Sequence, residues 1–333
     1  MRSRTLFGRL IAGVIAASLA LSVAPVWAID SGGTITNDAI VAGVRLQGLT
    51  ADEARAAIAA SLTVPPLAPL SAKAGVASFS LDASRMVTVD VEAIVARAFE
   101  PTSTSPLVIA PSYLVDPAAV TSWVKGVALK TDRAAVNAKR AVRSRRLVFT
   151  RSVDGVRLDT TASVTAVSNA LLAQAAAGGA AGPVVTLPQI VVTPKITTAS
   201  LGKTIVVVLG TRRVTLYKVG GATEKSYRCA IGMARYPTPR GTFRIIMKRK
   251  LPSWGNPGSS WAHGMPRYIK PGPNNPLGTR ALYLNASGIR IHGTNKTRSI
   301  GTAASHGCMR LTNRNIEDLF PRVPVGTTVY IVK

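Results

Sequence analysis

Cysteine, histidine and acidic residues are all scarce in this chain. Its 333 residues include 2 cysteines, 3 histidines and 15 Asp or Glu, against 41 Lys or Arg. Two cysteines cannot form the disulfide framework of a small secreted domain, so stability must come from packed cores. The cysteines and histidines show neither a Cys-x-x-Cys nor a His-x-x-x-His spacing, which leaves zinc binding as a minor alternative. We therefore expect no bound metal and no cofactor.

Long hydrophobic runs are absent beyond the N-terminus. There, three arginines within residues 2–9 precede an apolar run over residues 10–27, and residues 26–28 (VWA) loosely match a signal-peptidase cleavage pattern. We predict a signal peptide over residues 1–28 and export across a membrane. Left uncleaved, the same run would anchor the protein, although its two serines and its proline make it a poor permanent span.

The excess of basic residues gives a formal net charge of +26 and a pI near 11.2, which indicates an anionic partner. The Lys and Arg residues are scattered through predicted strands and loops, without a recognition helix or a nucleic-acid-binding motif, so we expect no nucleic-acid partner. For an exported protein, the available polyanions are anionic wall polymers, peptide carboxylates and the outer membrane leaflet. The alternative is that the charge only keeps the protein soluble near an acidic surface.

Proline and glycine punctuation divides the chain after the leader into four segments. They are a tether rich in Gly, Ser and Thr (29–37), an α+β unit (38–110), a second α+β unit with a linker (111–198) and a C-terminal domain (202–333). The tetrapeptide Gly-Val-Arg-Leu occurs in both α+β units, each time ahead of a helix that begins at a threonine. This repetition hints that the two units are related.

Capping signals and periodicity predict the elements of these two units. Residues 50–53 (TADE) form a capping box ahead of one helix, and residues 116–117 (DP) begin another, whose valines 120, 124 and 127 share a face. The basic run over residues 139–146 is predicted to be a solvated edge, with binding of a wall polymer as the alternative. The other predicted elements are strands at 40–46, 76–81 and 147–150, a helix at 90–99, a linker at 101–111, a helix ending near 175 and an extended segment at 183–198.

The C-terminal domain is predicted to be mainly β. Runs of Val, Ile, Thr and Tyr alternate with Gly and Pro at short intervals from residue 204 onward. Only residues 313–320 have a helical pattern, with Ile316, Leu319 and Phe320 facing inward. We expect a compact β-sandwich with short helices, and the loop over residues 252–276 is the candidate lid over a groove.

Two of the three histidines and one of the two cysteines lie close together in the sequence. Residues 291–294 (IHGT) precede residues 305–311 (SHGCMRL), which brings His292, His306 and Cys308 into one short stretch. A thiol attacks an acyl carbon only as the thiolate, so it needs an imidazole, a local positive charge and backbone N–H donors for the oxyanion. Arg310 supplies the charge, and the pattern predicts a cysteine nucleophile with a histidine base.

A histidine base needs a partner that orients its ring. Between Asp159 and Glu317 the only acidic residue is Glu224, so carboxylates are scarce around the motif. A backbone carbonyl is therefore favoured as the orienting group. Gly293 C=O is the candidate.

Strand alternation favours His292 as the base. Ile289 and Ile291 share one face of a predicted strand, which leaves Arg290 and His292 on the other face, away from the core. Spacing alone does not decide which imidazole meets the sulfur, so His306 stays open as the alternative.

The cysteines and the third histidine also have structural interpretations. Cys308 could be a small buried hydrophobic residue, but the flanking Ser-His-Gly and Arg favour catalysis. Cys229 lies in an alternating, strand-like run and is predicted to be a packed core residue. A disulfide between the two would consume the nucleophile, so we exclude it for the active form. His263 is predicted to be a solvated loop residue.

These motifs resemble the L,D-transpeptidase catalytic domain of the YkuD type, whose signature is a histidine, roughly fifteen residues, and then Ser/Thr-His-Gly-Cys-x-Arg/Asn. Here 306 − 292 gives 14 positions between the two histidines. The resemblance extends over about residues 203–333, and residues 236–243 (YPTPRGTF) are similar to the family's Thr-Pro-x-Gly-x-Phe element. Residues 38–194 are similar, through less specific motifs, to the peptidoglycan-binding domain often found ahead of such domains and in VanW-type proteins.

The resemblance implies roles for individual residues. Cys308 is the nucleophile, His292 is its general base, and Gly293 C=O orients His292. The N–H groups of Gly307 and Cys308 form the oxyanion hole, and the residues that shape the site are His306, Ser305, Arg310 and Asn313. The candidate walls of the substrate groove, with ordinary packing as the alternative, are Tyr283, Trp254 and Trp261.

The resemblance also implies the reaction. Cys308 attacks the carbonyl between the third and fourth residues of a peptidoglycan stem tetrapeptide, and an amine of another stem resolves the thioester into a 3→3 cross-link that contributes to wall organisation and cell shape. Carbapenem-type β-lactams would acylate the same sulfur. An L,D-carboxypeptidase would use the same residues with water as acceptor. The remaining alternative is a non-enzymatic wall-binding protein, and the N-terminal units either bind the wall or act as a spacer.

Overall fold

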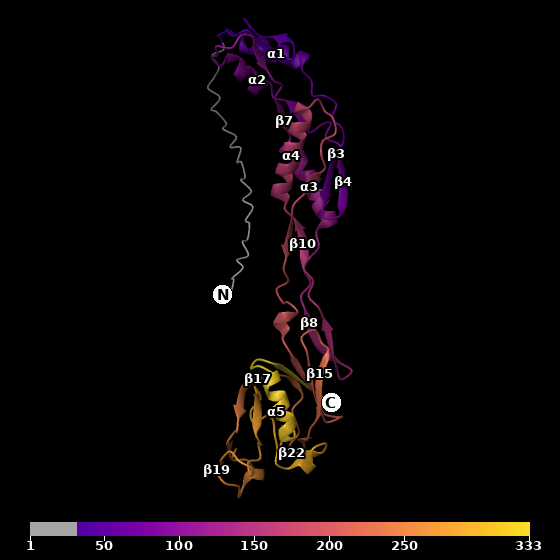
Figure 1. The fold of residues 1–333 in the computed structure, drawn as a ribbon, viewed down its shortest axis with the longest axis vertical. Coiled ribbons are helices and arrows are strands. Elements are labelled where there is room, and N and C mark those ends of the chain that lie inside the picture. Colours follow the sequence, from indigo (N-terminus) through magenta and orange to yellow (C-terminus); the bar gives the residue numbers. More distant parts are fainter. Residues whose placement is uncertain (1–31) are drawn as a thin grey trace, which may run out of the picture. The chain divides into compact units, whose positions relative to one another are not determined.

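The structure, a computed structural model, describes residues 32–333, which divide into two compact units (Figure 1). Unit 1 comprises the described residues up to 73 together with residues 78–124 and 161–186, and unit 2 comprises residues 74–77, 125–160 and 187–333. The predicted signal peptide lies outside the described residues, and the predicted domain boundaries stay a prediction. Within residues 32–333, no helix is long and apolar enough to cross a membrane.

The first two helices of unit 1 begin at capping side chains. Thr50 Oγ1 accepts a hydrogen bond from the Glu53 N–H, and the Thr50 N–H donates to Glu53 Oε2 at 2.8 Å, which starts α1 (Ala51–Ser61) as predicted. The carboxylate of Asp90 caps α2 (Val91–Phe99). Both helices bury one face in a common apolar core.

The segment predicted as a linker at residues 101–111 contains a strand. β6 (Leu107–Ile109) pairs in parallel with β1 (Ala39–Val41), which also pairs with β2 (Val44–Arg45). A three-residue strand is too short to show a hydrophobic period, so only the tertiary pairing identifies it. Ile35, in the predicted tether, is buried in the core of this unit.

Two longer helices follow. α3 (Pro117–Thr131) begins at the predicted Asp-Pro, and α4 (Thr160–Ala176) ends near the predicted position. Val120 and Val124 of α3 are fully buried, as their alignment on one face predicts. The remaining strands before residue 199, outside the hairpin described next, are β3 (Leu70–Ala74), β4 (Ala77–Leu81), β5 (Val87–Val89), β7 (Tyr113–Val115), β10 (Gly155–Leu158), β11 (Val185–Thr186) and β12 (Gln189–Val192).

The basic run at residues 139–146 is part of a hairpin in unit 2. β8 (Lys139–Arg143) pairs with β9 (Arg146–Thr150). Val142 is on the side of the hairpin that packs against the C-terminal sheet, and Arg140 donates a hydrogen bond to the Thr328 hydroxyl of that sheet at 2.6 Å. Most of the other basic side chains in the run are exposed.

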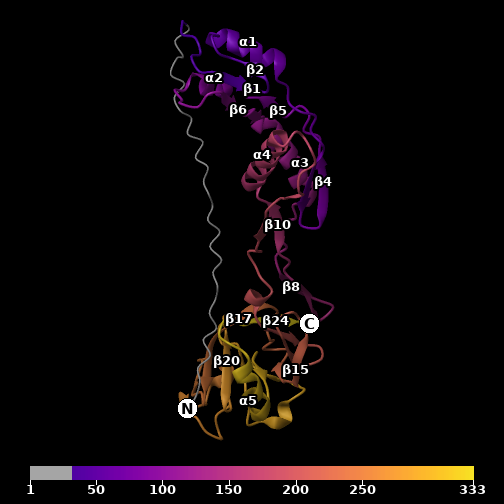
Figure 2. The same ribbon diagram turned by 45° about the horizontal axis from the view of Figure 1, so that its top comes forward.

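An eight-stranded sheet forms the frame of the C-terminal domain, in the order β15-β14-β13-β24-β17-β20-β21-β23. Its strands β15, β24, β17 and β20 are labelled in Figure 2. β17 (Gly241–Lys250) pairs with β24 through residues 241–244 and with β20 through residues 245–250, with a register shift near Ile245, so the sheet curls there. The mainly-β prediction for this domain and the α+β prediction for the N-terminal region are confirmed. The other strands of the sheet are β13 (Thr204–Val208), β14 (Arg213–Tyr217), β15 (Thr223–Arg228), β20 (Arg280–Leu284), β21 (Arg290–His292), β23 (Met309–Arg310) and β24 (Thr328–Val332).

One helix of this domain packs on β20 and β21. α5 (Asn313–Arg322) begins at Thr312, whose hydroxyl accepts a hydrogen bond from the Asn315 N–H at 3.2 Å. Its inward face consists of the predicted residues Ile316, Leu319 and Phe320. The helix is therefore fixed against the strand that ends at His292.

The loop over residues 252–276 contains short elements and a small apolar core of its own. Trp254 packs there with Ala262 and Leu277. The short elements of the domain are β16 (Ile231–Gly232), β18 (Trp254–Gly255), β19 (Tyr268–Ile269), β22 (Ala303–Ser305) and the 3-10 turns η1 (Ala199–Leu201), η2 (Ser260–Ala262) and η3 (Thr297–Ser299). This loop thus brings a folded wall to the site.

Candidate active site

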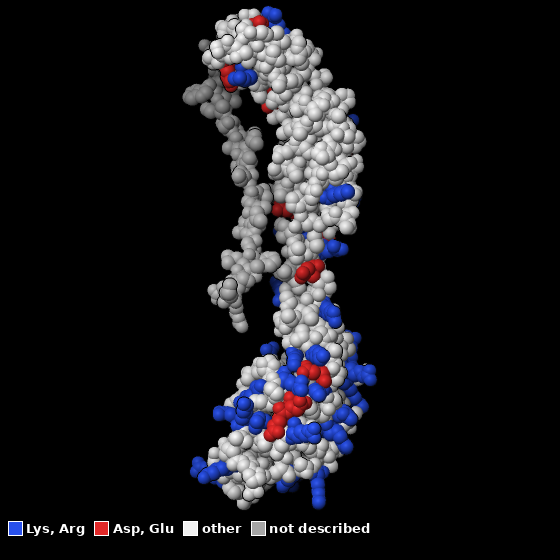
Figure 3. All heavy atoms as spheres, in the orientation of Figure 1, with Lys and Arg blue, Asp and Glu red and all other residues white. Residues whose placement is uncertain are grey.

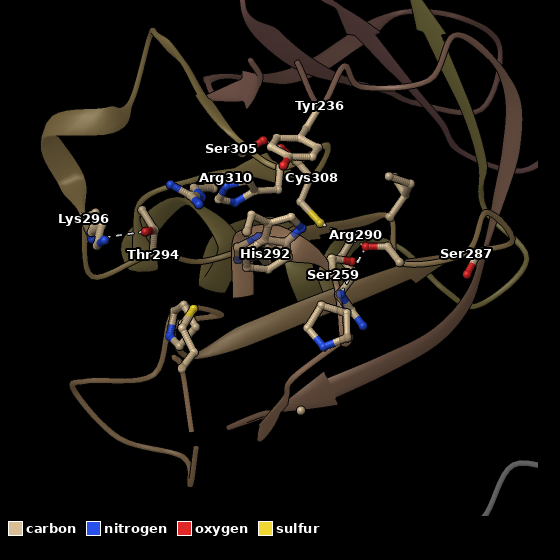
Figure 4. A pocket seen from close by; sticks show the side chains of 18 of the residues that line it. Tyr236, Ser259, Ser287, Arg290, His292, Thr294, Lys296, Ser305, Cys308 and Arg310 are labelled. Carbon is tan, nitrogen blue, oxygen red and sulfur yellow. Dashed lines mark hydrogen bonds between the residues drawn. The ribbon is translucent and has the colours of Figure 1, made fainter. Parts of the chain in front are cut away.

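A cavity of about 690 Å³ opens at the ends of β21 and β23 and contains most of the predicted site residues. Its lining includes Cys308, His292 and His306, and the side chains of Cys308, His292 and Arg310 point into the same space (Figure 4). The parallel pairing of β21 with β23 sets His292 beside Arg310, which brings together segments that are separate in the sequence.

The turn before β23 requires the glycine of the motif. Gly307 has φ +107°, and a Cβ at that position would lie 3.0 Å from the Ile289 side chain. The buried Ser305 hydroxyl donates to Cys308 C=O at 2.6 Å, which closes the turn. The turn therefore fixes the backbone that carries the sulfur.

The Cys308 thiol is hydrogen-bonded to a backbone carbonyl. Its Sγ donates to Gly288 C=O at 3.2 Å. Burial raises the pKa of the Cys308 thiol, and the charges of Arg290 and Arg310 oppose that rise. The resting form at neutral pH is therefore the thiol, not the thiolate.

His292 is oriented by the carbonyl that the sequence indicates. Its Nδ1 lies 2.6 Å from Gly293 C=O, and because a carbonyl can only accept, Nδ1 carries the proton and Nε2 keeps its lone pair. Burial lowers the pKa of His292 to about 3, and the charges of Arg310 and Arg290 add to this effect. The imidazole is thus neutral near pH 7, with the Nε2 lone pair unprotonated.

Asn313 supports the loop that follows His292. Its Oδ1 accepts a hydrogen bond from the Thr279 N–H at 3.1 Å. A Cβ added to Gly293 would lie 2.3 Å from the same oxygen, so only glycine fits there. Asn313 therefore acts on the site through the backbone next to His292.

His306 forms part of an aromatic wall. Its ring stacks on Trp261 with centroids 4.0 Å apart and an interplanar angle of 8°, and Tyr236 contacts it edge-on at 5.1 Å. Burial and the charges of Arg310 and Lys296 lower the pKa of His306. These contacts make His306 part of the cavity wall, so His292 is the better candidate for the base.

Two backbone N–H groups next to the sulfur are free to bind an oxyanion. Neither the Gly307 N–H nor the Cys308 N–H donates to an acceptor within residues 32–333. Buried or half-buried donors without partners are uncommon, and donors at a nucleophile can receive the charge of a tetrahedral intermediate. The arrangement suits acyl transfer.

The three predicted groove residues have different positions. Trp261 lines the cavity, whereas Trp254 and Tyr283 are not among its lining residues. Trp254 is only 6% exposed, in the core of the loop at 252–276. Tyr283 lies beneath the guanidinium of Arg290, with 4.9 Å between the Arg290 Cζ and the ring centroid.

The other cysteine and histidine lie elsewhere. Cys229 is fully buried, and burial raises the pKa of its thiol to about 12, so the prediction of a core residue is confirmed. His263 is exposed and does not line the cavity. Among residues 32–333, no group of three His, Cys, Asp or Glu side chains could hold a metal ion.

Three cations face the cavity, and none of its lining residues within the described chain is acidic. The cations are Arg290, Arg310 and Lys296, of which the motif indicated only Arg310. Arg290 was detectable, because alternation puts it on the face of His292. Lys296 and Tyr236 had no comparable signal, since loops bring them to the site. A cavity of this charge suits an anionic ligand.

Comparison with known proteins agrees with the geometry. The family model for the L,D-transpeptidase catalytic domain matches residues 202–331, and the model described as "Putative peptidoglycan binding domain" matches residues 79–176. A crystal structure of an L,D-transpeptidase from Enterococcus faecium is 17% identical and covers 79% of this chain and 94% of that chain, with a TM-score of 0.35.

Two relatives bear names of the same kind. "Putative L,D-transpeptidase in ATP synthase subunits region ORF 5" of Fuscovulum blasticum is 38% identical over 136 residues, 40% of this chain and 71% of that protein. "Probable L,D-transpeptidase ErfK/SrfK" of Escherichia coli (strain K12) is 34% identical over 158 residues, 45% of this chain and 49% of that protein, so the chain spans about half of its length. The chain belongs to the L,D-transpeptidase family.

Proposed function

We propose that this protein is an exported peptidoglycan L,D-transpeptidase that forms 3→3 cross-links through Cys308. The observation that carries the proposal is the hydrogen bond from His292 Nδ1 to Gly293 C=O at 2.6 Å, because it leaves Nε2 as a base in the cavity that holds the thiol. A packed structural cysteine would need no such arrangement.

The reaction has two acyl-transfer steps. The Cys308 thiol gives its proton to His292 Nε2 as the sulfur attacks the carbonyl between the third and fourth residues of a stem tetrapeptide. The Gly307 and Cys308 N–H groups stabilise the oxyanion, and His292 returns the proton to the departing amine of the terminal D-residue. An amine of a second stem then attacks the thioester, gives a proton to His292 and restores the thiol.

The resting protonation states shape this mechanism. The thiol pKa is raised and the His292 pKa is lowered to about 3, so the pair is neutral before substrate binds. The thiolate therefore forms during attack rather than in advance, and groups that stabilise negative charge on sulfur govern the rate.

The proposal extends to partners and location. The region of the second family match would hold peptidoglycan, and the basic surface would hold anionic wall polymers. Export follows from the apolar run over residues 10–27, either as a cleaved signal peptide or as an anchor.

Product analysis tests the reaction. Purified protein is incubated with muropeptide tetrapeptides, and the products are separated and weighed by mass spectrometry. We expect dimers with loss of the terminal D-residue, and Cys308→Ala should reduce turnover to background while the protein still sediments with cell wall. Trimmed monomers alone would indicate an L,D-carboxypeptidase, and equal turnover by Cys308→Ala would refute the catalytic assignment.

A carbapenem should acylate the same sulfur. Its strained lactam carbonyl takes the place of the stem carbonyl, and the ring opens onto Cys308 Sγ. We expect one adduct per chain, located on the peptide that contains Met309 and Arg310, and none on the buried Cys229. An adduct that persists in Cys308→Ala would contradict this.

A further inference from the structure

Arg290 lies between the predicted nucleophile and an aromatic ring. On β21 it is directly opposite Tyr283 of β20, and the parallel register of β21 with β23 aligns Ile291 with Met309. Extending that register by one residue sets Arg290 beside Cys308. Arg290 also lines the cavity, although the motif assigns it no role.

The guanidinium of Arg290 is held from two directions. Nη1 donates to Gly288 C=O at 3.1 Å, and the group lies over the Tyr283 ring. The Nε atom is buried and has no hydrogen-bond partner within residues 32–333. A fixed guanidinium therefore keeps one donor unused beside the sulfur.

The carbonyl of Gly288 accepts from both side chains. Cys308 Sγ donates to it at 3.2 Å, and Arg290 Nη1 donates to it at 3.1 Å. This contact suits the thiol, but once the proton leaves, the carbonyl oxygen faces a negative sulfur. A positive donor close to both atoms offsets that repulsion.

Two arginines lie around the sulfur, in addition to the histidine that takes its proton. β21 contributes Arg290 and the neutral His292, β23 contributes Arg310, and the turn contributes the half-buried His306. The Nη1 of Arg310 is already bound to Ala304 C=O at 3.2 Å. The charge, the backbone N–H and the side chain of Arg290 all lower the pKa of the Cys308 thiol against the effect of burial.

We infer that Arg290 is a further catalytic residue: as the S–H proton of Cys308 passes to His292 Nε2, the unused Nε–H of Arg290 donates a hydrogen bond to the thiolate. Tyr283 positions Arg290 and does not touch the substrate. The inference rests on the proposed role of Cys308 as nucleophile, but it concerns the thiol itself and does not depend on which acyl group is transferred.

The pH dependence of thiol alkylation tests it. Iodoacetamide reacts with the thiolate, and intact-mass spectrometry follows adduct formation on the wild type, Arg290→Gln, Arg290→Lys and the control Arg249→Gln. Arg249 is exposed on β17 and does not line the cavity, so its variant removes the same charge elsewhere in the domain. Cys229 is the internal measure of unfolding, because it is fully buried.

The loss of a charge-assisted hydrogen bond should shift the rate–pH curve of Arg290→Gln toward higher pH by about one to two pH units. At pH 7–8 this corresponds to alkylation that is about 10- to 100-fold slower. Arg290→Lys should recover part of the rate, and Arg249→Gln should match the wild type. Turnover of tetrapeptide should fall in parallel with alkylation. If folded Arg290→Gln gives the same rate–pH curve as the wild type, the inference is overturned.

If Arg290→Gln does not fold, a second pair of variants still tests the inference. Tyr283→Phe keeps the ring under the guanidinium and should alkylate as the wild type does, whereas Tyr283→Leu should slow alkylation severalfold. Equal rates in these two variants and in Arg290→Lys would also overturn the inference. If the alkylation shifts appear but no stem peptide is turned over, the proposed function fails and the inference stands.

Discussion

At the scale of single residues, the two histidines of the motif have different surroundings. His292 is 4% exposed and bonded to Gly293 C=O, so its ring is fixed. His306 is stacked on Trp261, so its ring is part of the cavity wall. These contacts support the proposal that His292, rather than His306, is the base.

This difference predicts the results of two substitutions. His292→Asn removes the base and should lower tetrapeptide turnover by about 10²- to 10⁴-fold. His306→Phe keeps the stack with Trp261 and should retain turnover within about tenfold. Turnover is measured by mass spectrometry of the donor, with melting temperature as the control for folding. An inactive His306→Phe beside an active His292→Asn would reverse the assignment.

At the scale of elements, the start of α5 and the end of β21 meet at one oxygen. Asn313 Oδ1 occupies the space next to Gly293, and a Cβ on Gly278 would also come within 2.2 Å of it. The helix is held in place by its apolar face, because Ile316 and Leu319 are fully buried. The packing of α5 therefore sets the loop that orients His292.

A double-mutant cycle tests this contact. Gly293→Ala should destabilise the domain by about 1–3 kcal/mol and abolish most turnover, because the added methyl meets Asn313 Oδ1 at 2.3 Å. Adding Asn313→Ala should recover part of both losses, since the clashing atom is removed. The control is Gly126→Ala in α3, where nothing lies within 4 Å, and it should be neutral or stabilising. Strictly additive losses would show that the two residues do not interact.

At the scale of the whole molecule, positive charge is concentrated in the C-terminal domain. Residues 202–333 contain 22 Lys or Arg and 3 Asp or Glu, a difference of +19 out of the +26 of the whole chain. Figure 3 shows basic side chains gathered over the part that bears β15, β17 and α5, while the part that bears α3 and α4 is mostly uncharged on that face. The domain that carries the cavity is thus also the domain suited to polyanions.

We predict that salt weakens the proposed attachment of this protein to an acidic cell wall. Exposed charges are screened within about 10 Å at 0.1 M salt and about 3 Å at 1 M. We expect the fraction of protein that sediments with purified cell wall to fall steadily as NaCl rises from about 50 mM to about 500 mM. Screening of exposed charges becomes strong over this range. Cys308→Ala is the control and should behave as the wild type. Salt-independent sedimentation would place the binding in apolar or shape contacts instead.

The sequence by itself determined the elements and the chemistry that depend on local order. Neighbours within one or two turns of chain determine the capping box of α1, the inward face of α5 and the Ser-His-Gly-Cys motif. The structure contains all three. Tertiary structure alone decided the rest. β6 exists through its pairing with β1, Trp261 reaches His306 across a loop, and Arg290 reaches Cys308 through the register of β21 with β23. Such contacts join residues far apart in sequence, and no local propensity or period encodes them.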